Sequence, residues 1–308
     1  MSRVRLITSL LFAGGLAASA LAARPGAREE TLAVREGSRW IIWWHQGSPP
    51  ARWPHDGGLA RHVEWRAGPS GIEWGEVQLK GGGEARRTRV VLVRLDPRRV
   101  RLSLVPAFTS TGGWTVAEAD SGAVLALDAG QFRRSLPWGW VVTRGRELLP
   151  PEFAPLAGAV AVDSSGSVRV VAPESVAAVR RRGSAIEAFQ SFPMLLRDGV
   201  VTGALQEPGH GVDIGHRDAR LALGTLPDGR VVVALTRFDG LGATFGQVPF
   251  GLTSAEMAAV MGGLGCRDAL ALDGGISGQL LVRDAAGRAR RWPGIRSVPL
   301  GLVGRANP

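Results

Sequence analysis

Short apolar runs, separated by glycine, proline or polar turn residues, recur along the chain from about residue 89 onward. Runs of this length that are rich in β-branched residues predict strands. The clearest pair covers residues 221–225 and 230–236, which flank the turn Pro227-Asp228-Gly229 and predict a hairpin. Further strands are predicted at residues 89–95, 100–105, 125–128, 138–143, 158–162 and 167–171, of which the last two form a second hairpin.

Two helices are expected, a short one that starts at Thr115 and a longer one over residues 254–263. Thr253 and Glu256 have the spacing of a capping box, in which both side chains bind the first backbone amides of the helix. Glu256 would also suit a catalytic acid, but the cap explains it, and we leave it out of the site. Many strands, hairpin turns and few helices predict an α+β domain with mixed, largely antiparallel β-sheets.

The N-terminus has the pattern of an export signal. Arg3 and Arg5 precede an apolar stretch that ends at Ala20-Leu21-Ala22, so residues 1–22 are predicted to be a signal peptide. The alternative is an uncleaved anchor, because the stretch is only marginally long enough to span a membrane. We expect an exported protein, periplasmic or secreted, with no stable membrane span after signal cleavage. Cys266 is the only cysteine, so no intramolecular disulfide can form.

A tryptophan-rich extension is predicted at residues 23–70, before a main domain at residues 71–308. Residues 23–75 hold six of the ten tryptophans, interrupted by proline and glycine. The indoles could form a platform for sugar rings, or an irregular extension could pack them onto the main domain. Without a repeat or a periodic pattern, we favour packing.

The chain carries a net charge of +10, with Lys80 as its only lysine. A basic protein outside the cytoplasm favours anionic partners such as phosphodiesters or acidic glycans. No basic helix, finger spacing or RNA-binding motif indicates a nucleic-acid partner. The sequence does not indicate an oligomeric state.

Candidate chemistry lies where two predicted strands end. Residues 123–127 run into Asp128, and residues 269–272 run into Asp273, each followed by small residues that include glycine. Polar side chains at the end of a buried strand, next to bare backbone, are how a rigid scaffold presents chemistry to a ligand. The two strand ends predict one shared site.

Two familiar chemistries find little support. Ser277 lacks the final glycine of a nucleophile elbow, and every histidine precedes it in the chain, which argues against a serine hydrolase of that fold. His210 and His216 lie near Asp213 and Asp218, but without the compact spacing of a metal motif. We therefore expect no cofactor, although the sequence does not decide whether a divalent cation binds.

What remains is an anion and carbohydrate site. Arg217 and Arg220 lie where a polar loop enters the strand at residues 221–225, and an arginine there can grip a phosphate. The alternative is an arginine paired with Asp218 or another carboxylate. Exposed backbone amides at Gly274 and Gly275 would assist the same anion.

The ordered set of motifs resembles the phosphodiester glycosidase family from about Gly71 to Leu302. Four segments match the family in the right order, at residues 128–132, 192–199, 220–224 and 252–275. The chain departs from the family motifs at four positions. Asp128 replaces an asparagine, Ala129 a glycine, Leu221 a threonine and Ile276 a glycine.

The resemblance implies an exported glycosidase that hydrolyses a sugar-1-phosphodiester linkage in an envelope glycan or glycolipid. Its expected catalytic residues are Asp273, Asp128 and Arg220. Its expected substrate-binding residues are Arg217, Gly274, Gly275, Ser277, Gln279 and Gln131. The alternatives are a non-catalytic envelope polysaccharide-binding protein of the same fold and a hydrolase for another acidic sugar linkage.

Overall fold

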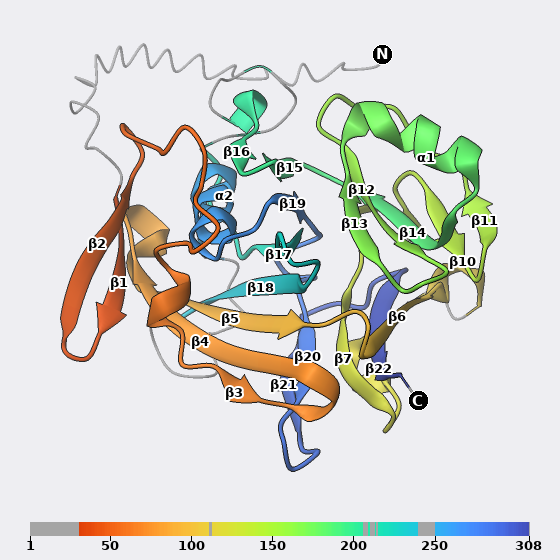
Figure 1. The fold of residues 1–308 in the computed structure, drawn as a ribbon, viewed down its shortest axis with the longest axis horizontal. Coiled ribbons are helices and arrows are strands. Elements are labelled where there is room, and N and C mark those ends of the chain that lie inside the picture. The colour runs from red at the N-terminus through yellow and green to blue at the C-terminus, as the bar shows by residue number, and fades with distance from the viewer. Residues whose placement is uncertain are drawn as a thin grey trace, which may run out of the picture.

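The fold was analysed in a computed structural model that describes residues 31–110, 113–205, 209, 213, 215–239 and 250–307. Across this part of the chain, the strands form a ten-stranded sheet, two five-stranded sheets and a two-stranded ribbon, and their pairs are antiparallel (Figure 1). This confirms the predicted α+β class. The predicted signal peptide at residues 1–22 lies outside the described residues.

The ten-stranded sheet spans most of the domain. In spatial order its strands are β16 (Val200–Val201), β15 (Met194–Arg197), β19 (Asp268–Ala271), β17 (Leu221–Thr225), β18 (Val231–Phe238), β5 (Thr88–Leu95), β4 (Ile72–Lys80), β1 (Thr31–Glu36) and β2 (Arg39–His45), and β3 (Arg66–Ala67) also pairs with β4.

One of the two five-stranded sheets lies at the right of the central strands in Figure 1. It contains β11 (Arg146–Leu149), β10 (Val141–Thr143), β14 (Ala185–Ser191), β12 (Gly158–Asp163) and β13 (Val168–Val171). The other contains β21 (Ala289–Trp292), β20 (Leu280–Arg283), β7 (Ala123–Asp128), β22 (Gly301–Ala306) and β6 (Val100–Val105), while β8 (Phe132–Arg133) and β9 (Leu136–Pro137) form the ribbon.

Helices are few among the described residues, and none is long and apolar enough to cross a membrane. The α-helices are α1 (Val176–Arg182) and α2 (Ser254–Gly263). The 3-10 helices are η1 (Ala60–His62), η2 (Pro69–Gly71), η3 (Gly83–Arg87), η4 (Ala107–Thr109), η5 (Val116–Glu118), η6 (Pro173–Ser175) and η7 (Gly203–Leu205).

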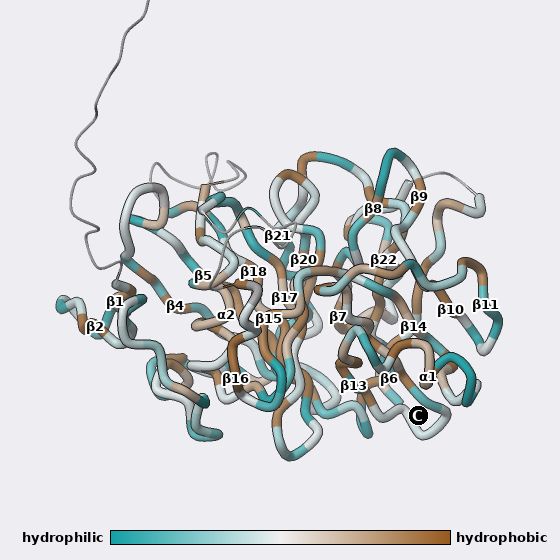
Figure 2. Tube along the Cα trace, turned by 90° about the horizontal axis from the view of Figure 1, so that it is seen from above, coloured by the Kyte–Doolittle hydropathy of each residue, from teal (hydrophilic) through white to brown (hydrophobic). Residues whose placement is uncertain are grey.

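The central strands are apolar on both faces because both faces are covered. In β5, Val91 and Val93 pack into a core shared with the five-stranded sheets, whereas Val90 and Leu92 pack into a second core with α2. A strand buried on both sides reads as a continuous apolar run, as in the apolar stretches through the central strands in Figure 2. These two cores fix the positions of the strand ends that carry the candidate site.

The tryptophan-rich segment packs onto the domain, as favoured from the sequence. Trp43 and Trp53 lie 6.0 Å apart by ring centroid and cover α2 where Gly262 and Gly263 leave room. The segment is more regular than expected, however, since β1 and β2 form a hairpin and β1 pairs with β4. The large sheet therefore extends across the domain boundary expected at residue 71.

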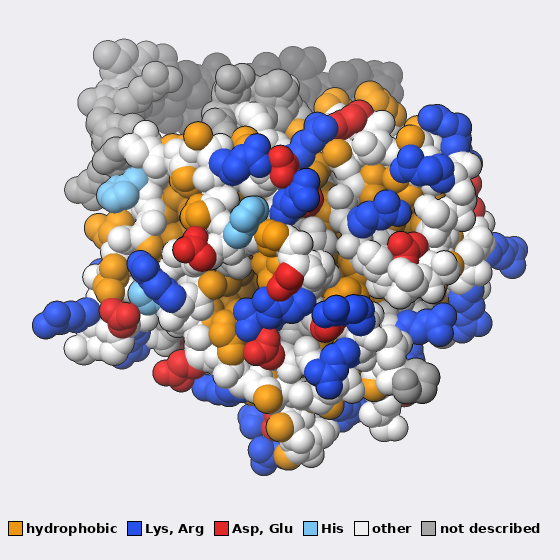
Figure 3. Space-filling model, in the orientation of Figure 1, with side chains coloured by type: hydrophobic (Ala, Val, Ile, Leu, Met, Phe, Trp, Pro, Cys, Tyr) orange, Lys and Arg blue, Asp and Glu red, His pale blue; other side chains and the backbone are white. Residues whose placement is uncertain are grey.

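On the face shown in Figure 3, the arginines do not gather into one basic patch. Blue side chains are spread among acidic and apolar ones across this surface. On this face, the positive net charge of the chain therefore does not mark a binding surface.

Candidate functional site

The two strand ends singled out in the sequence meet where two sheets join. Asp128 is the last residue of β7, and Asp273 follows β19 by two positions. Residues 272–279 then carry the chain from β19 in the ten-stranded sheet to β20, which pairs with β7 in a five-stranded sheet. The Gln279 N–H donates to Asp128 Oδ1 at 3.0 Å, which ties the end of this loop to the end of β7.

Asp128 is completely buried. Burial raises the pKa of its carboxyl well above the usual range, and the negative charge of Asp273 raises the pKa further. The Gln279 amide and the charge of Arg237 act in the opposite direction. Among the described residues, Asp128 Oδ2 has no hydrogen-bond partner. The carboxyl is therefore held in its neutral form far into the pH range where aspartate is normally ionised.

Asp273 is the more accessible of the two, with 16% of its side chain exposed. Burial raises its pKa to about 6, against the effects of a hydrogen bond with Ser277 and the charge of Arg296. Its Oδ2 lies 3.9 Å from Arg296 Nη2 and finds no hydrogen-bond partner within the described ranges. Two buried carboxyls with different accessibility and raised pKa values are a common feature of catalytic sites.

The glycines after Asp273 let the loop lie directly on the segment that precedes β17. The Gly275 N–H donates to Ala219 O at 2.7 Å. A Cβ at Gly274 would lie 2.2 Å from the same oxygen, and Gly275 has a φ of 55°. These positions thus require glycine for close packing. Exposed amides were expected at both glycines, but the Gly275 amide donates to a backbone carbonyl inside the protein.

Arg220 lies beside the Asp273 loop, immediately before β17. Its Nε donates to Leu252 O at 2.8 Å, and its Nη2 donates to His216 O at 2.6 Å. Two of its three guanidinium nitrogens therefore hold backbone carbonyls. The arginine reaches the expected place but is largely committed to joining the loop before β17 to the segment before α2.

Arg217 is tied to Glu256. Its Nη1 lies 2.5 Å from Glu256 Oε2, its Nη2 lies 3.0 Å from Oε1, and the two side chains are 10% and 0% exposed. Glu256 also accepts the Thr253 N–H at 2.9 Å, which confirms the predicted capping box. Arg217 thus has a carboxylate partner, but the partner is Glu256 rather than Asp218.

Three further predicted residues form hydrogen bonds around the aspartates, two of them with backbone atoms. The Ser277 hydroxyl accepts from Arg296 Nε at 2.8 Å. Gln279 Oε1 accepts the Val116 N–H at 2.8 Å, and Gln131 Nε2 donates to Leu272 O at 3.2 Å. Ser277 and Gln279 are each 1% exposed, so they support the site as buried residues.

Two arginines at the site were not anticipated. Arg237 is 5% exposed, and its Nη2 donates to Gly278 O at 2.6 Å and to the carbonyls of Trp292 and Pro293. Arg237 could have been found from the sequence, because it is a lone charged residue in the apolar run of β18. Arg296 lies in the irregular segment after β21 and had no such signal.

No group of three or more histidine, cysteine, aspartate or glutamate residues is placed to hold a metal ion in the described part of the chain. His216 Nε2 lies 3.6 Å from Asp218 Oδ2. His210, the other histidine considered, lies outside the described residues.

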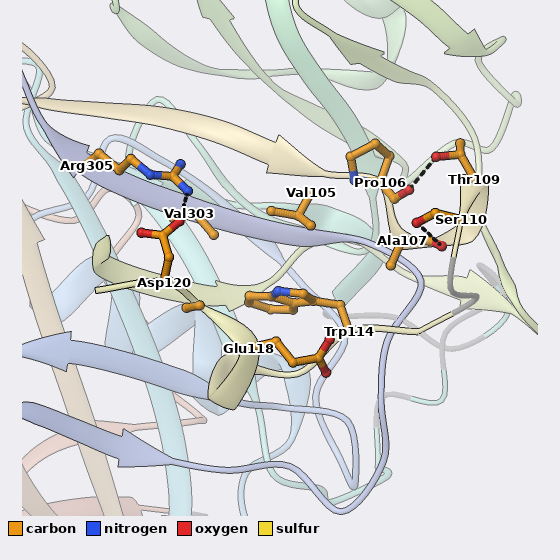
Figure 4. Close-up of a pocket in the computed structure, with 11 residues that line it drawn as sticks. Val105, Pro106, Ala107, Thr109, Ser110, Trp114, Glu118, Asp120, Val303 and Arg305 are labelled. Atoms are coloured by element: carbon orange, nitrogen blue, oxygen red, sulfur yellow. Dashed lines mark hydrogen bonds and ion pairs between the residues drawn. The ribbon is translucent and has the colours of Figure 1, made fainter. Parts of the chain in front are cut away.

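A separate pocket of about 410 Å³ lies over β6 and β22 (Figure 4). The Arg305 guanidinium and the Asp120 carboxylate form an ion pair at 2.5 Å within its lining. None of the nine predicted site residues lines this pocket, so it is distinct from the carboxylate pair. Its lining residues are Val105, Pro106, Ala107, Thr109, Ser110, Trp114, Glu118, Ala119, Asp120, Val303 and Arg305.

Asp128→Asn is expected to raise the free energy of unfolding at pH 7 by about 1–3 kcal/mol, because the amide needs no proton to stay neutral when buried. An unfolded aspartate ionises near pH 4, whereas the native Asp128 keeps its proton to higher pH because its pKa is raised. The wild-type protein therefore loses stability as the pH rises above about 4, and the variant escapes this loss.

Urea unfolding of both proteins at about pH 4 and pH 7 measures this difference. Asp96→Asn is the control, because its hydrogen bond with Arg98 lowers the pKa of Asp96 and predicts the opposite sign. A loss of stability of equal size at both pH values would contradict the prediction for Asp128.

The fold and the site define a largely antiparallel α+β protein with a buried carboxylate pair where two sheets join. Comparison with protein families gives a match to the phosphodiester glycosidase family over residues 115–303. The chain belongs to the phosphodiester glycosidase family. No match is found among curated proteins.

Solved structures share the fold at low sequence identity. The catalytic domain of zebrafish N-acetylglucosamine-1-phosphodiester alpha-N-acetylglucosaminidase, auto-inhibited by its pro-peptide, is 14% identical, with a TM-score of 0.58 over 80% of this chain and 88% of that one. A hypothetical protein from Synechocystis is 15% identical, with a TM-score of 0.54 over 91% and 68% of the two chains. A candidate exported protein from Burkholderia pseudomallei is 17% identical, with a TM-score of 0.51 over 75% and 77%.

Proposed function

We propose that this protein is an exported glycosidase that hydrolyses the bond between the anomeric carbon of a sugar and a phosphodiester in an envelope glycan or glycolipid. Family membership supports the reaction class, and the zebrafish neighbour is named for an N-acetylglucosamine-1-phosphodiester substrate. The signal-like pattern of residues 1–22 supports export.

The observation that carries the proposal is the pair of buried carboxyls, Asp128 and Asp273. Each has an Oδ2 without a hydrogen-bond partner among the described residues, and each has a raised pKa. Buried polar atoms without partners are rare in folded proteins and are costly to keep. A site that retains two of them, one on the accessible Asp273, is best explained by a reactant that meets Asp273.

The two carboxyls would have different tasks because only Asp273 is accessible. In the proposed reaction, water adds to the anomeric carbon, and Asp273 accepts the proton that the water loses. The bond between the anomeric carbon and the bridging oxygen breaks, and this oxygen leaves with phosphorus as a phosphomonoester. Because the leaving phosphate is already a weak base, activation of the water matters more than protonation of the leaving group.

Asp128 would then act on Asp273 rather than on the substrate. A neutral carboxyl beside Asp273 avoids the repulsion that a second charge would bring. Gln279, Gln131 and Ser277 would keep the loop in place, and Arg220 would fix the neighbouring segment. Arg217 would contribute through its ion pair with Glu256 to the position of that same segment.

A non-catalytic envelope polysaccharide-binding protein is the second candidate. It is favoured by the internal use of groups expected to contact substrate, since the Gly275 amide binds Ala219 and the Arg217 guanidinium binds Glu256. Such a protein would keep the fold and a glycan-binding surface without turnover.

A substrate panel separates these functions. The purified protein is offered nitrophenyl sugar-phosphodiesters, matched neutral nitrophenyl glycosides and isolated envelope glycans. Release of free sugar and phosphomonoester from the phosphodiesters alone supports the proposed reaction. Tight binding of the glycans without any turnover supports the binding protein, and turnover of only the neutral glycosides contradicts the proposed linkage.

The proposed base predicts the pH dependence of the reaction. Because burial raises the pKa of Asp273 to about 6, the ionised base is lost below this pH. We expect kcat/KM to rise about tenfold per pH unit below pH 6 and to level above it. Initial rates between about pH 4.5 and pH 8 measure the profile. A profile that is flat or falls with rising pH in this range would show that Asp273 is not the base.

A further inference from the structure

Arg296 lies beside Asp273, although no motif contains it. The segment that carries it is fixed to the Asp273 loop, because the Ile295 N–H donates to Ile276 O at 2.7 Å. Arg296 Nε donates to the Ser277 hydroxyl at 2.8 Å, and its guanidinium carbon lies 4.4 Å from the ring centroid of Phe132. The guanidinium plane is thus held on one face and on one edge.

The other edge of this guanidinium is open. Among the described residues, neither Nη1 nor Nη2 of Arg296 has a hydrogen-bond acceptor, and 49% of the side chain is exposed. Asp273 Oδ2 lies 3.9 Å from Nη2, close enough for attraction but too far for a hydrogen bond. Two parallel N–H donors on a fixed plane match two oxygens of a phosphate.

The other arginines around the site are less suited than Arg296 to bind a phosphate. Arg237 is 5% exposed and binds backbone carbonyls, and Arg217 is 10% exposed and binds Glu256. Arg220 holds carbonyls with Nε and Nη2. Arg296 combines exposure, two open donors and proximity to Asp273.

We propose that Arg296, held by Ser277 and Phe132, binds the phosphate oxygens of the substrate. This inference rests on the proposed glycosidase function and assigns its phosphate contact to Arg296 instead of Arg220. Because its positive charge lies 3.9 Å from Asp273 Oδ2, the guanidinium also offsets the repulsion between the phosphate and the carboxylate that activates water. The anomeric carbon next to the bound phosphate is then placed toward Asp273.

The test compares Arg296→Gln and Arg296→Lys with Arg291→Gln, an exposed arginine on β21 that serves as a matched control. Calorimetry measures the binding of inorganic phosphate, and kinetics measure KM and kcat on a sugar phosphodiester. Arg296→Gln is expected to weaken phosphate binding and to raise KM by about 10- to 100-fold, with a smaller effect on kcat. Arg296→Lys is expected to lie between, because it keeps the charge but loses the planar fork.

The outcomes separate this inference from the proposed function. If the wild-type protein binds phosphate through Arg296 but hydrolyses no sugar phosphodiester, the glycosidase function fails while the phosphate site stands. If Arg296→Gln is folded by thermal melting and keeps the wild-type KM and phosphate affinity, the assignment of Arg296 is overturned. An effect of Arg291→Gln as large as that of Arg296→Gln would also overturn it.

Discussion

Asp273→Asn is expected to lower kcat on a sugar phosphodiester by about 10²–10⁴-fold and to leave KM nearly unchanged. The amide keeps the size of the side chain and its place beside Ser277 and Arg296, but it cannot accept a proton. Ground-state contacts with the substrate are therefore retained while the step that needs a base is lost. Steady-state kinetics on the purified variant, with thermal melting to verify folding, measure this effect.

The control for this variant is Asp228→Asn, which removes a carboxylate from the turn between β17 and β18, away from the site. Its kinetics should match those of the wild-type protein. If Asp273→Asn keeps most of its kcat, the proposed base is wrong. Asp218 would then be the next carboxylate to test, because its charge acts on Asp273 and burial raises its own pKa.

The elements with strong local signals were predictable from the sequence. The turn at residues 227–229 correctly placed the hairpin of β17 and β18, and the capping box correctly placed the start of α2 at Ser254. The helix expected from Thr115 is only the three-residue η5, which Thr115 caps. Local backbone chemistry decides such features, so one sequence suffices to find them.

Elements with short or mixed patterns were missed. α1 has seven residues and buries only Val176 and Val179, too few positions for a helical period to stand out. The hairpin of β1 and β2 was hidden because Trp43 packs against Gly263 of α2, far along the chain. Tertiary packing, rather than local propensity, determines these elements.

The residues of the candidate site likewise divide into those found from local sequence patterns and those placed by tertiary contacts. Asp128 and Asp273 were found because each follows an apolar strand, and antiparallel pairing with β20 then brings their strands together. The contacts of Arg296 with Phe132 and of Arg217 with Glu256 join residues far apart in the chain. No spacing rule encodes such contacts, so the sequence offered Asp218 or an unspecified carboxylate as a partner for Arg217, without pointing to Glu256.

Breaking the ion pair of Arg217 and Glu256 is expected to cost the most stability of any single change considered. Glu256→Gln should lower the free energy of unfolding by about 3–5 kcal/mol, because it removes the buried carboxylate that pairs with the guanidinium of Arg217. Arg217→Met should cost a similar amount. The double variant should cost less than the sum of the two, since it leaves neither charge unpaired.

Urea unfolding of the two single variants and the double variant completes the cycle. Arg98→Met is the control, because Arg98 is exposed and its ion pair with Asp96 lies at the surface, so its loss should leave stability nearly unchanged. Additive costs would show that the pair is not coupled.

The same variants also test whether Arg217 contacts the substrate. If it acts only through Glu256, folded Arg217→Met keeps the wild-type KM, whereas a direct substrate contact would raise KM even where the variant is fully folded.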